Sequence, residues 1–341
     1  MKQDSSQQTT THNIRLTSAE ISNLWGTYIA NSMSVCVLKH FYHHCEDEQI
    51  KEVVKYALSL SEKHVHTVAE IFNHEKFPLP VGFTDEDVDL SAPRLYADTF
   101  YLNYLHQTTK SGYSMYTIAL PNIARADVRD FFSECISSLT ELYNRIASLS
   151  LAKGVFIRPP YVPIPNDVEF VQSSQFLAGF LGRQRAINTL EITHVYSNIQ
   201  SNALGRALIV GFSQVTKHPD VRHYFLRGKE IATHHIDTLS KILHNEDLPS
   251  PMTWDHDVME STTPPFSDKL MLFHINGVNA LSIFNYGAAL SGAQRHDLNA
   301  TYSRLMAQVG LYAEAGARLM IRHGWLEQTP LAADRPRLAR V

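Results

Sequence analysis

The sequence predicts an all-α protein built from two tandem four-helix bundles, each with a long crossover between its second and third helices. Three observations lead to this prediction. The chain repeats itself after half its length, apolar residues recur with a helical period in both copies, and a long proline-containing segment interrupts each copy at the same place. The chain has 341 residues, of which 44% are hydrophobic, which is enough for two domains of about 150 to 170 residues.

The internal repeat is visible in short matching stretches. The segments "NHEKFPLP" at residues 73–80 and "HNEDLPSP" at residues 244–251 both end in Pro-x-Pro. Residues up to these prolines align with their counterparts in the second copy at one constant offset in residue number. Residues after the prolines align at an offset that is one position shorter. The aligned pairs include Glu20 with Glu191, Asn31 with Asn202, His64 with His235, Pro78 with Pro249, Pro80 with Pro251, Asp98 with Asp268, Arg125 with Arg295, Asp127 with Asp297 and Gly154 with Gly324.

The first two helices of each copy follow from a start signal and a buried seam. Thr17 and Glu20 have the spacing of a capping box, whereas Thr189 and Glu191 keep the acid without that spacing. In the second helix, seam residues recur at alternating steps of four and three. The seam consists of Ile50, Val54, Ala57, Ser61, His64, Val68 and Ile71 in copy one, and of Val221, Phe225, Gly228, Ala232, His235, Leu239 and Ile242 in copy two.

The third and fourth helices are predicted in the same way. The third is expected to begin near Pro93 in copy one and near Pro264 in copy two, because proline suits a first helical turn. The fourth is expected over about residues 126–153, with Gly154 and Gly324 as C-terminal caps. Its seam consists of Val128, Phe132, Cys135, Leu139, Leu142, Ile146 and Leu149, matched by Leu298, Tyr302, Leu305, Val309, Tyr312, Gly316 and Leu319.

The lengths of the connections predict the topology and the domain boundaries. Short links join helices one to two and three to four, which favours antiparallel hairpins, whereas the long link between helices two and three suits a crossover along the bundle. The expected organisation is a disordered tail over residues 1–13, a first bundle over 14–157, a linker over 158–186, a second bundle over 187–328 and a C-terminal tail over 329–341. The phenylalanine and leucine content of the linker suggests that it packs against a bundle.

Composition argues against two classes of partner. The 30 basic and 34 acidic side chains give a net charge of −4, so no broad attraction to nucleic acid is expected. An uninterrupted apolar run of about 18 residues is missing from the sequence, so no membrane partner is expected either. The three cysteines show no CxxC spacing, which favours a cytoplasmic location. Protein partners or self-association remain open.

Several separated segments carry a family resemblance: "IRLTSAEISNLW", "EKHVHTVAEIFN", "GFTDEDVDLSAPRLYADTF", "GVFIRPPYVP", "NALGRALIVGFSQV" and "PPFSDKLMLFHINGVNA". In these stretches the chain resembles the tandem ferritin-like proteins of unknown function from spore-forming bacteria, some of which are called coat-protein-F-like or spore coat proteins. The resemblance implies two ferritin-like bundles and a spore association, and it implies no established activity.

The standard ferritin-type di-iron set is not present in the sequence. That centre needs carboxylates from four helices and a Glu-x-x-His pair on two of them. The one Glu-x-x-His match, Glu191 with His194, lies on the first helix of copy two, and its counterpart in copy one is Glu20 with Asn23. Glu134 and Glu141 on the fourth helix align with Arg304 and Leu311. A transition metal in some other site is left open as a cofactor.

A smaller set of candidate site residues survives, because both copies keep the same polar residues within apolar stripes. These residues are Glu20, Asn31 and His64 in copy one, and Glu191, Asn202 and His235 in copy two. The two histidines are interpreted either as core residues with satisfied ring nitrogens or as metal ligands, and the two glutamates either as helix-start acids or as part of the same site. Glu20 and His64 differ by roughly 9 Å in level along the bundle, which already disfavours a common site. His40 and His44 are read as solvated surface residues.

The sequence therefore favours a non-catalytic structural or interaction protein, with a spore or stress association implied by the resemblance. The alternative is a metal- or small-molecule-binding protein with a site in the core of one or both bundles. A catalytic assignment has no supporting motif: the Walker A loop, the Gly-x-Ser-x-Gly elbow and His-Glu-x-x-His are absent from the sequence.

Overall fold

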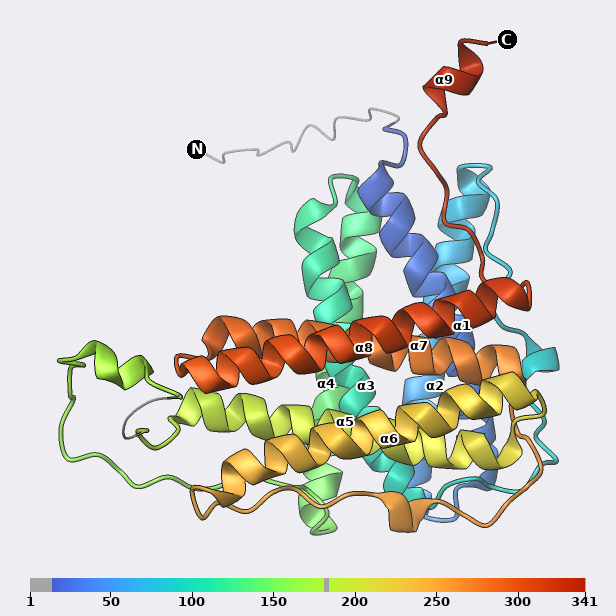
Figure 1. Cartoon of the computed structure of the whole chain (residues 1–341). Helices are drawn as coiled ribbons and strands as arrows, with labels where there is room; N and C mark the ends of the chain where they lie inside the picture. Colours follow the sequence, from blue (N-terminus) through green and yellow to red (C-terminus); the bar gives the residue numbers. More distant parts are fainter. Residues whose placement is uncertain (1–13, 181–183, 341) are drawn as a thin grey trace, which may run out of the picture.

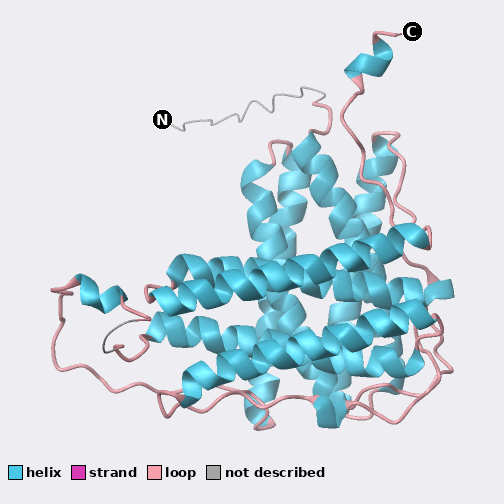
Figure 2. Cartoon of the chain, in the orientation of Figure 1, coloured by secondary structure: helices cyan, strands magenta, loops and turns pink. Residues whose placement is uncertain are grey.

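The computed structural model describes residues 14–180 and 184–340 and confirms the all-α, tandem-bundle prediction (Figures 1 and 2). The expected disordered tail at residues 1–13 lies outside the described residues. The first bundle contains α1 (Ser18–His44), α2 (Glu48–His74), α3 (Asp98–Ala119) and α4 (Ala126–Ala152). The second contains α5 (Thr189–Val215), α6 (Pro219–His244), α7 (Asp268–Gly292) and α8 (His296–Arg322). A short α9 (Arg335–Leu338) lies in the exposed C-terminal segment.

The ends of the helices follow from local sequence signals. The predicted capping box forms at Thr17 and Glu20, and the second copy repeats it with Asn188 as the N-cap of α5. The expectation that copy two lacks this spacing is therefore wrong, because the residue aligned with Thr17 is Asn188 rather than Thr189. Gly154 and Gly324 adopt φ values of 68° and 69° just past α4 and α8, which confirms them as caps.

The third helix of each copy begins later than predicted, at Asp98 and at Asp268 instead of near Pro93 and Pro264. The residues before these starts are extended, because their backbone groups bond to the crossover of the other bundle. The two aspartates also have a structural partner. Their carboxylates accept backbone N–H groups of residues 46 and 47 in one bundle and of residues 217 and 218 in the other.

The two crossovers pair with each other around a pseudo-twofold axis, so that each bond between them has a counterpart in which the two copies exchange places. In the first reciprocal pair, the amide of Asp89 donates to the Pro265 carbonyl and the amide of Met259 donates to the Leu95 carbonyl, both at 2.9 Å. In the second pair, the amide of Ala97 donates to the Asp257 carbonyl at 2.8 Å, and the amide of Ser267 donates to the Asp87 carbonyl at 3.0 Å. Such reciprocity is the property of an isologous dimer interface, here enclosed within one chain.

Side chains extend this interface into a continuous core. On α3, the Tyr104 hydroxyl lies 3.2 Å from Nε2 of His274 on α7, and because these two residues are aligned in the repeat, their contact lies at the pseudo-twofold axis. The fully buried Tyr96 donates its hydroxyl to the Leu208 carbonyl at 2.9 Å. A Cβ at Gly211 would lie 2.5 Å from the Tyr96 hydroxyl, so only glycine admits this approach. One hydrophobic cluster consequently spans both bundles, whose long axes cross in Figure 1.

The linker differs from its prediction. Residues 161–175 are all exposed, including the large apolar side chains of Tyr161, Ile164 and Phe170, and this green segment runs away from the bundles in Figure 1. The expectation that it packs against a bundle is wrong for this stretch, because its Pro-rich start keeps it extended. None of the helices in the described part of the chain combines the length and hydropathy needed to cross a membrane.

Candidate functional site

A small polar cluster lies inside each bundle, formed by one residue from each of its first three helices. In the first bundle, Nδ2 of Asn31 donates to the Thr27 carbonyl at 2.8 Å and to the Tyr116 hydroxyl at 3.3 Å. Oδ1 of Asn31 lies 3.2 Å from Nδ1 of His64. Asn31 on α1 and His64 on α2 thus face each other, and Tyr116 on α3 completes the cluster.

The second bundle repeats the cluster with one additional member. Asn202 donates to the Tyr286 hydroxyl at 2.8 Å, and that hydroxyl lies 2.9 Å from Nδ1 of His235. The second ring nitrogen of His235, Nε2, lies 2.9 Å from Oε1 of Gln308 on α8. In the alignment of the two copies, Tyr286 is the counterpart of Tyr116, whereas the counterpart of Gln308 is Ser138. His235 therefore has partners at both nitrogens.

The hydrogen-bond partners assign opposite tautomers to the two histidines. A backbone carbonyl only accepts, so the bond to Thr27 fixes which side-chain atom of Asn31 is the nitrogen. The remaining amide oxygen then accepts a hydrogen from Nδ1 of His64, and Nε2 of His64 is left as an acceptor. In the second bundle Tyr286 donates to Nδ1 of His235, and Nε2 carries the hydrogen toward Gln308. Burial lowers the pKa of both histidines to about 4, so both rings are neutral near pH 7.

Glu20 and Glu191 do not join these clusters. Glu20 closes the capping box of α1 and accepts the backbone amides of Ala124 and Arg125, which precede α4. Burial would raise the pKa of Glu20, but the hydrogen bonds from Thr17 and from those two amides outweigh it and leave the pKa below its ordinary value. The glutamate ties the starts of α1 and α4 together at the end of the bundle, three turns from the level of Asn31.

Glu191 has the same role and one further partner. It accepts the amides of Gln294 and Arg295 at 3.1 Å, and its two oxygens each receive a nitrogen of Arg185 at 2.8 Å. Against the effect of burial, the Arg185 guanidinium and these amides hold the pKa of Glu191 below its ordinary value. The sequence left two interpretations of Glu20 and Glu191 open, a helix-start acid or part of the histidine site, and in the structure both lie at helix starts.

A cavity of about 540 Å³ opens beside the polar cluster of the first bundle. Its walls come from α1, α2, α3 and α4, and from α5 and α7 of the other bundle. Asn31, His64 and Tyr116 all line it, together with Gln107 on α3. Two further lining residues, Ile118 and Phe284, are large apolar side chains with exposed fractions of 55% and 44%, so the cavity opens to solvent along α3 and α7.

The second bundle fills the corresponding space with two tyrosines. Tyr224 and Tyr312 stack with their ring centroids 4.2 Å apart, and the Tyr312 hydroxyl donates to the Tyr224 carbonyl. Their counterparts in the first bundle are the smaller Val53 and Leu142, and Leu142 lines the cavity. In addition, α5 packs along α7, whereas α1 meets α3 over a much shorter stretch. The cavity of the first bundle thus coincides with smaller side chains and with less contact between its first and third helices.

Two buried polar side chains of the cavity wall have unmet hydrogen-bonding capacity. Gln107 is 3% exposed, and its Oε1 has no partner in the part of the chain that the structure describes. His274 is 5% exposed, and its Nδ1 is likewise without a partner there. Buried polar atoms of this kind generally have a partner. The sequence carries no signal at Gln107, because the repeat replaces it by Gly277 and only the fold brings it to the cavity.

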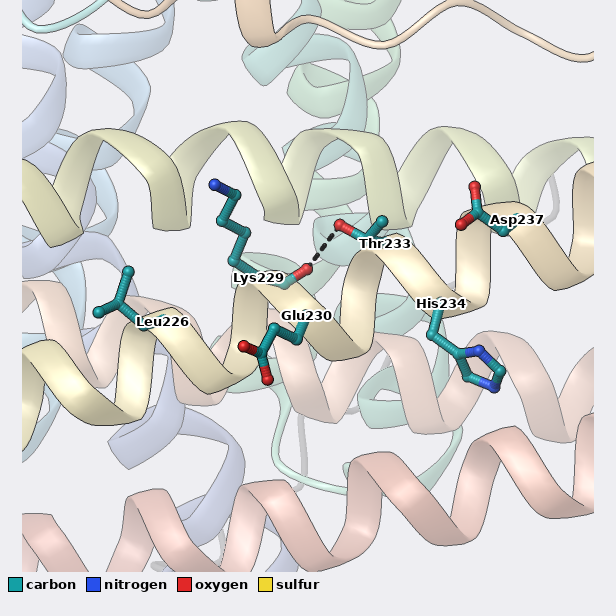
Figure 3. A pocket seen from close by; sticks show the side chains of 6 residues that line it. All are labelled: Leu226, Lys229, Glu230, Thr233, His234 and Asp237. Atoms are coloured by element: carbon teal, nitrogen blue, oxygen red, sulfur yellow. Dashed lines mark hydrogen bonds between the residues drawn. The ribbon is translucent and has the colours of Figure 1, made fainter.

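A second group of polar side chains lies on α6 and does not form a site. Figure 3 shows a shallow depression lined by six side chains that all belong to α6, where the Thr233 hydroxyl donates to the Lys229 carbonyl of its own helix at 2.8 Å. The described residues contain no group of three or more His, Cys, Asp or Glu side chains placed to hold a metal ion.

The prediction that His40 and His44 are solvated surface residues is wrong for His40. His40 is 1% exposed, and its Nε2 lies 3.2 Å from the Ala92 carbonyl of the crossover. The crossover that covers it is distant in sequence, so its burial could not be read from α1 alone.

The match to a family model agrees with the duplicated architecture. A model of the family described as "Protein of unknown function (DUF3231)" matches residues 5–168 and again residues 175–338. A crystal structure of a "putative spore coat protein" from Bacillus halodurans C-125 is similar at 18% identity and a TM-score of 0.39, covering 44% of this chain and 98% of its own. A comparison with curated protein sequences gives no match. Because the family model covers most of both halves, the chain belongs to the DUF3231 family, in which it carries the matching unit twice.

Proposed function

We propose that this protein is a non-catalytic binding protein whose first bundle holds a small molecule and whose second bundle is its rigid partner. One observation carries the proposal: the same polar cluster is present in both bundles, and in the first bundle its residues line an open cavity, whereas the second bundle holds the stacked rings of Tyr224 and Tyr312. A concave, mostly apolar pocket with a few convergent polar groups is the usual form of a small-molecule site. Binding is favoured over catalysis, because the described lining includes no carboxylate that could act with His64 as a base.

A titration with an uncharged fluorescent probe tests this function. N-phenyl-1-naphthylamine should bind the full chain saturably at one site, with an increase in its emission. Leu142→Tyr introduces the side chain found at the equivalent position of the filled bundle and should abolish that binding. Leu151→Tyr places the same side chain at an exposed position on the same helix and is the matched control. Absence of saturable binding, or equal binding by both variants, would refute the proposal.

A structural role in the spore is a second candidate function. It is supported by the resemblance of the chain to tandem ferritin-like spore proteins and by the reciprocal pairing of the crossovers, which joins two bundles into one body. A location in the cytoplasm of the cell or in the spore coat follows from this candidate. The test is an immunoblot of washed spore-coat extracts and of cytosol from the same sporulating culture. Signal confined to the cytosol would remove the coat role.

A further inference from the structure

We infer that the ligand of the first bundle is an uncharged, largely apolar molecule with a hydroxyl or other hydrogen-bond donor at one end. This inference rests on the proposed function and specifies the chemistry of the molecule that the cavity takes. It follows from three properties of the cavity wall, namely its charge, its apolar surface and the kind of hydrogen-bonding atom that it leaves free.

The first property is the absence of charge from the described lining of the cavity. Among those residues there is no Asp, Glu, Lys or Arg, and the polar contribution comes from amide, hydroxyl and neutral imidazole groups. A charged ligand would therefore be moved out of water without an opposite charge to pair with, which is strongly unfavourable. The nearest basic candidate on α3, Lys110, is not part of the lining, and its ammonium group is directed at Oε1 of Gln200, 3.5 Å away.

The second property is the apolar surface that makes up most of the wall. Leucine side chains from several helices converge there, among them Leu38, Leu105 and Leu139. The two exposed side chains at the opening, Ile118 and Phe284, continue this surface to the solvent. A ligand that carries a hydrocarbon portion gains by removing this surface from water.

The third property is the direction of the free hydrogen bonds. Nε2 of His64 is an acceptor, since Nδ1 donates to Asn31, and Oε1 of Gln107 is a second acceptor without a partner in the described residues. In the second bundle, the amide oxygen of Gln308 occupies the position opposite the corresponding ring nitrogen. Ser138 replaces it in the first bundle and donates its hydroxyl to carbonyls of its own helix instead. A ligand donor can satisfy Oε1 of Gln107, which lines the cavity, whereas a ligand acceptor cannot.

Displacement of the fluorescent probe by four compounds with a ten-carbon chain tests the inference on the full chain. The compounds are 1-decanol, decyl methyl ether, decanoate and decylammonium, which share an apolar chain and differ in the head group. The alcohol should displace the probe at about tenfold lower concentration than the ether, the effect of one hydrogen bond. Both ions should be at least about a hundredfold weaker than the alcohol.

Two matched variants localise the effect. Gln107→Leu should reduce the preference for alcohol over ether while the ether still displaces the probe, and Gln308→Leu in the second bundle should leave the preference unchanged. Equal displacement by all four compounds, with Leu142→Tyr still abolishing probe binding, would refute the inference and leave the proposed function intact. A preference for decanoate that Lys110→Met removes would also overturn it. Absence of probe binding would refute both.

Discussion

His64 and His235 occupy equivalent positions in the two bundles, yet they donate through opposite ring nitrogens. His64 donates from Nδ1 to Asn31, and His235 donates from Nε2 to Gln308. The two copies thus keep the same residue for different purposes. In the second bundle the imidazole completes a closed network, and in the first it belongs to a residue that lines a cavity.

The tautomers can be observed directly. Nitrogen-detected NMR of the imidazole rings should report a protonated Nδ1 for His64 and a protonated Nε2 for His235 near pH 7, because each ring has a fixed donor site. His64→Gln and His235→Gln assign the two signals. Identical tautomers in both bundles would contradict the assignment.

Exchanging side chains between the bundles should move the cavity. Tyr312→Leu removes a stacked ring and the hydrogen bond to the Tyr224 carbonyl, and we expect it to lower the free energy of unfolding by about 2 to 4 kcal/mol. Leu142→Tyr adds volume where space exists and should cost less than about 1 kcal/mol. Denaturant unfolding measures both changes. A loss of about 1 to 3 kcal/mol for Leu142→Tyr would mean that the first bundle is already packed.

The two helix-start glutamates should contribute unequally to stability. Glutamine keeps one acceptor oxygen but puts an N–H donor opposite the backbone amides that precede α4 or α8. Glu20→Gln should therefore cost about 1 to 2 kcal/mol. Glu191→Gln should cost about 2 to 4 kcal/mol, because it also leaves the half-buried Arg185 without its carboxylate. Thermal and denaturant unfolding would test the order, and an equal loss in both variants would contradict it.

Buried neutral histidines should make the protein sensitive to acid. Burial lowers the pKa of His40, His64, His235 and His274 to about 4, and each returns to its ordinary value of about 6.5 on unfolding. Between these two pKa values the unfolded chain binds more protons than the folded chain. The free energy of unfolding is therefore highest above about pH 6.5 and falls as the pH drops toward about 4. Each histidine should cost on the order of 2 kcal/mol between pH 7 and pH 5. In His235→Gln, the slope of the free energy of unfolding against pH should fall by the contribution of about one bound proton. An unchanged slope would show that His235 does not contribute to this pH dependence.

The repeat made the fold predictable, because each seam could be read twice. The helix bounds of α2 and α4 follow from the periodicity, and the levels of Glu20 and His64 along the helices already suggested that these two residues do not meet. The capping role of Asn188 was visible at the position aligned with Thr17. In contrast, the delayed start of α3 depends on backbone bonds to a segment in the other half of the chain, which no local pattern reveals.

The cavity could not be predicted, for a physical reason that its residues illustrate. The replacement of Val53 by Tyr224 and of Leu142 by Tyr312 is visible on aligning the two halves, but the fold shows that these rings stack on each other and fill one space. A void depends on which side chains face each other and on how far apart their helices lie. Gln107 is a similar case, since its partnerless oxygen is a property of the packed structure.

A crystal structure of the full chain with 10-bromodecan-1-ol tests the central claim most directly. One bromine site is expected inside the cavity of the first bundle, with the hydroxyl within hydrogen-bonding distance of Oε1 of Gln107 and with no bromine in the second bundle. Bromine between α6 and α8, or an alcohol whose hydroxyl avoids Gln107, would contradict the account.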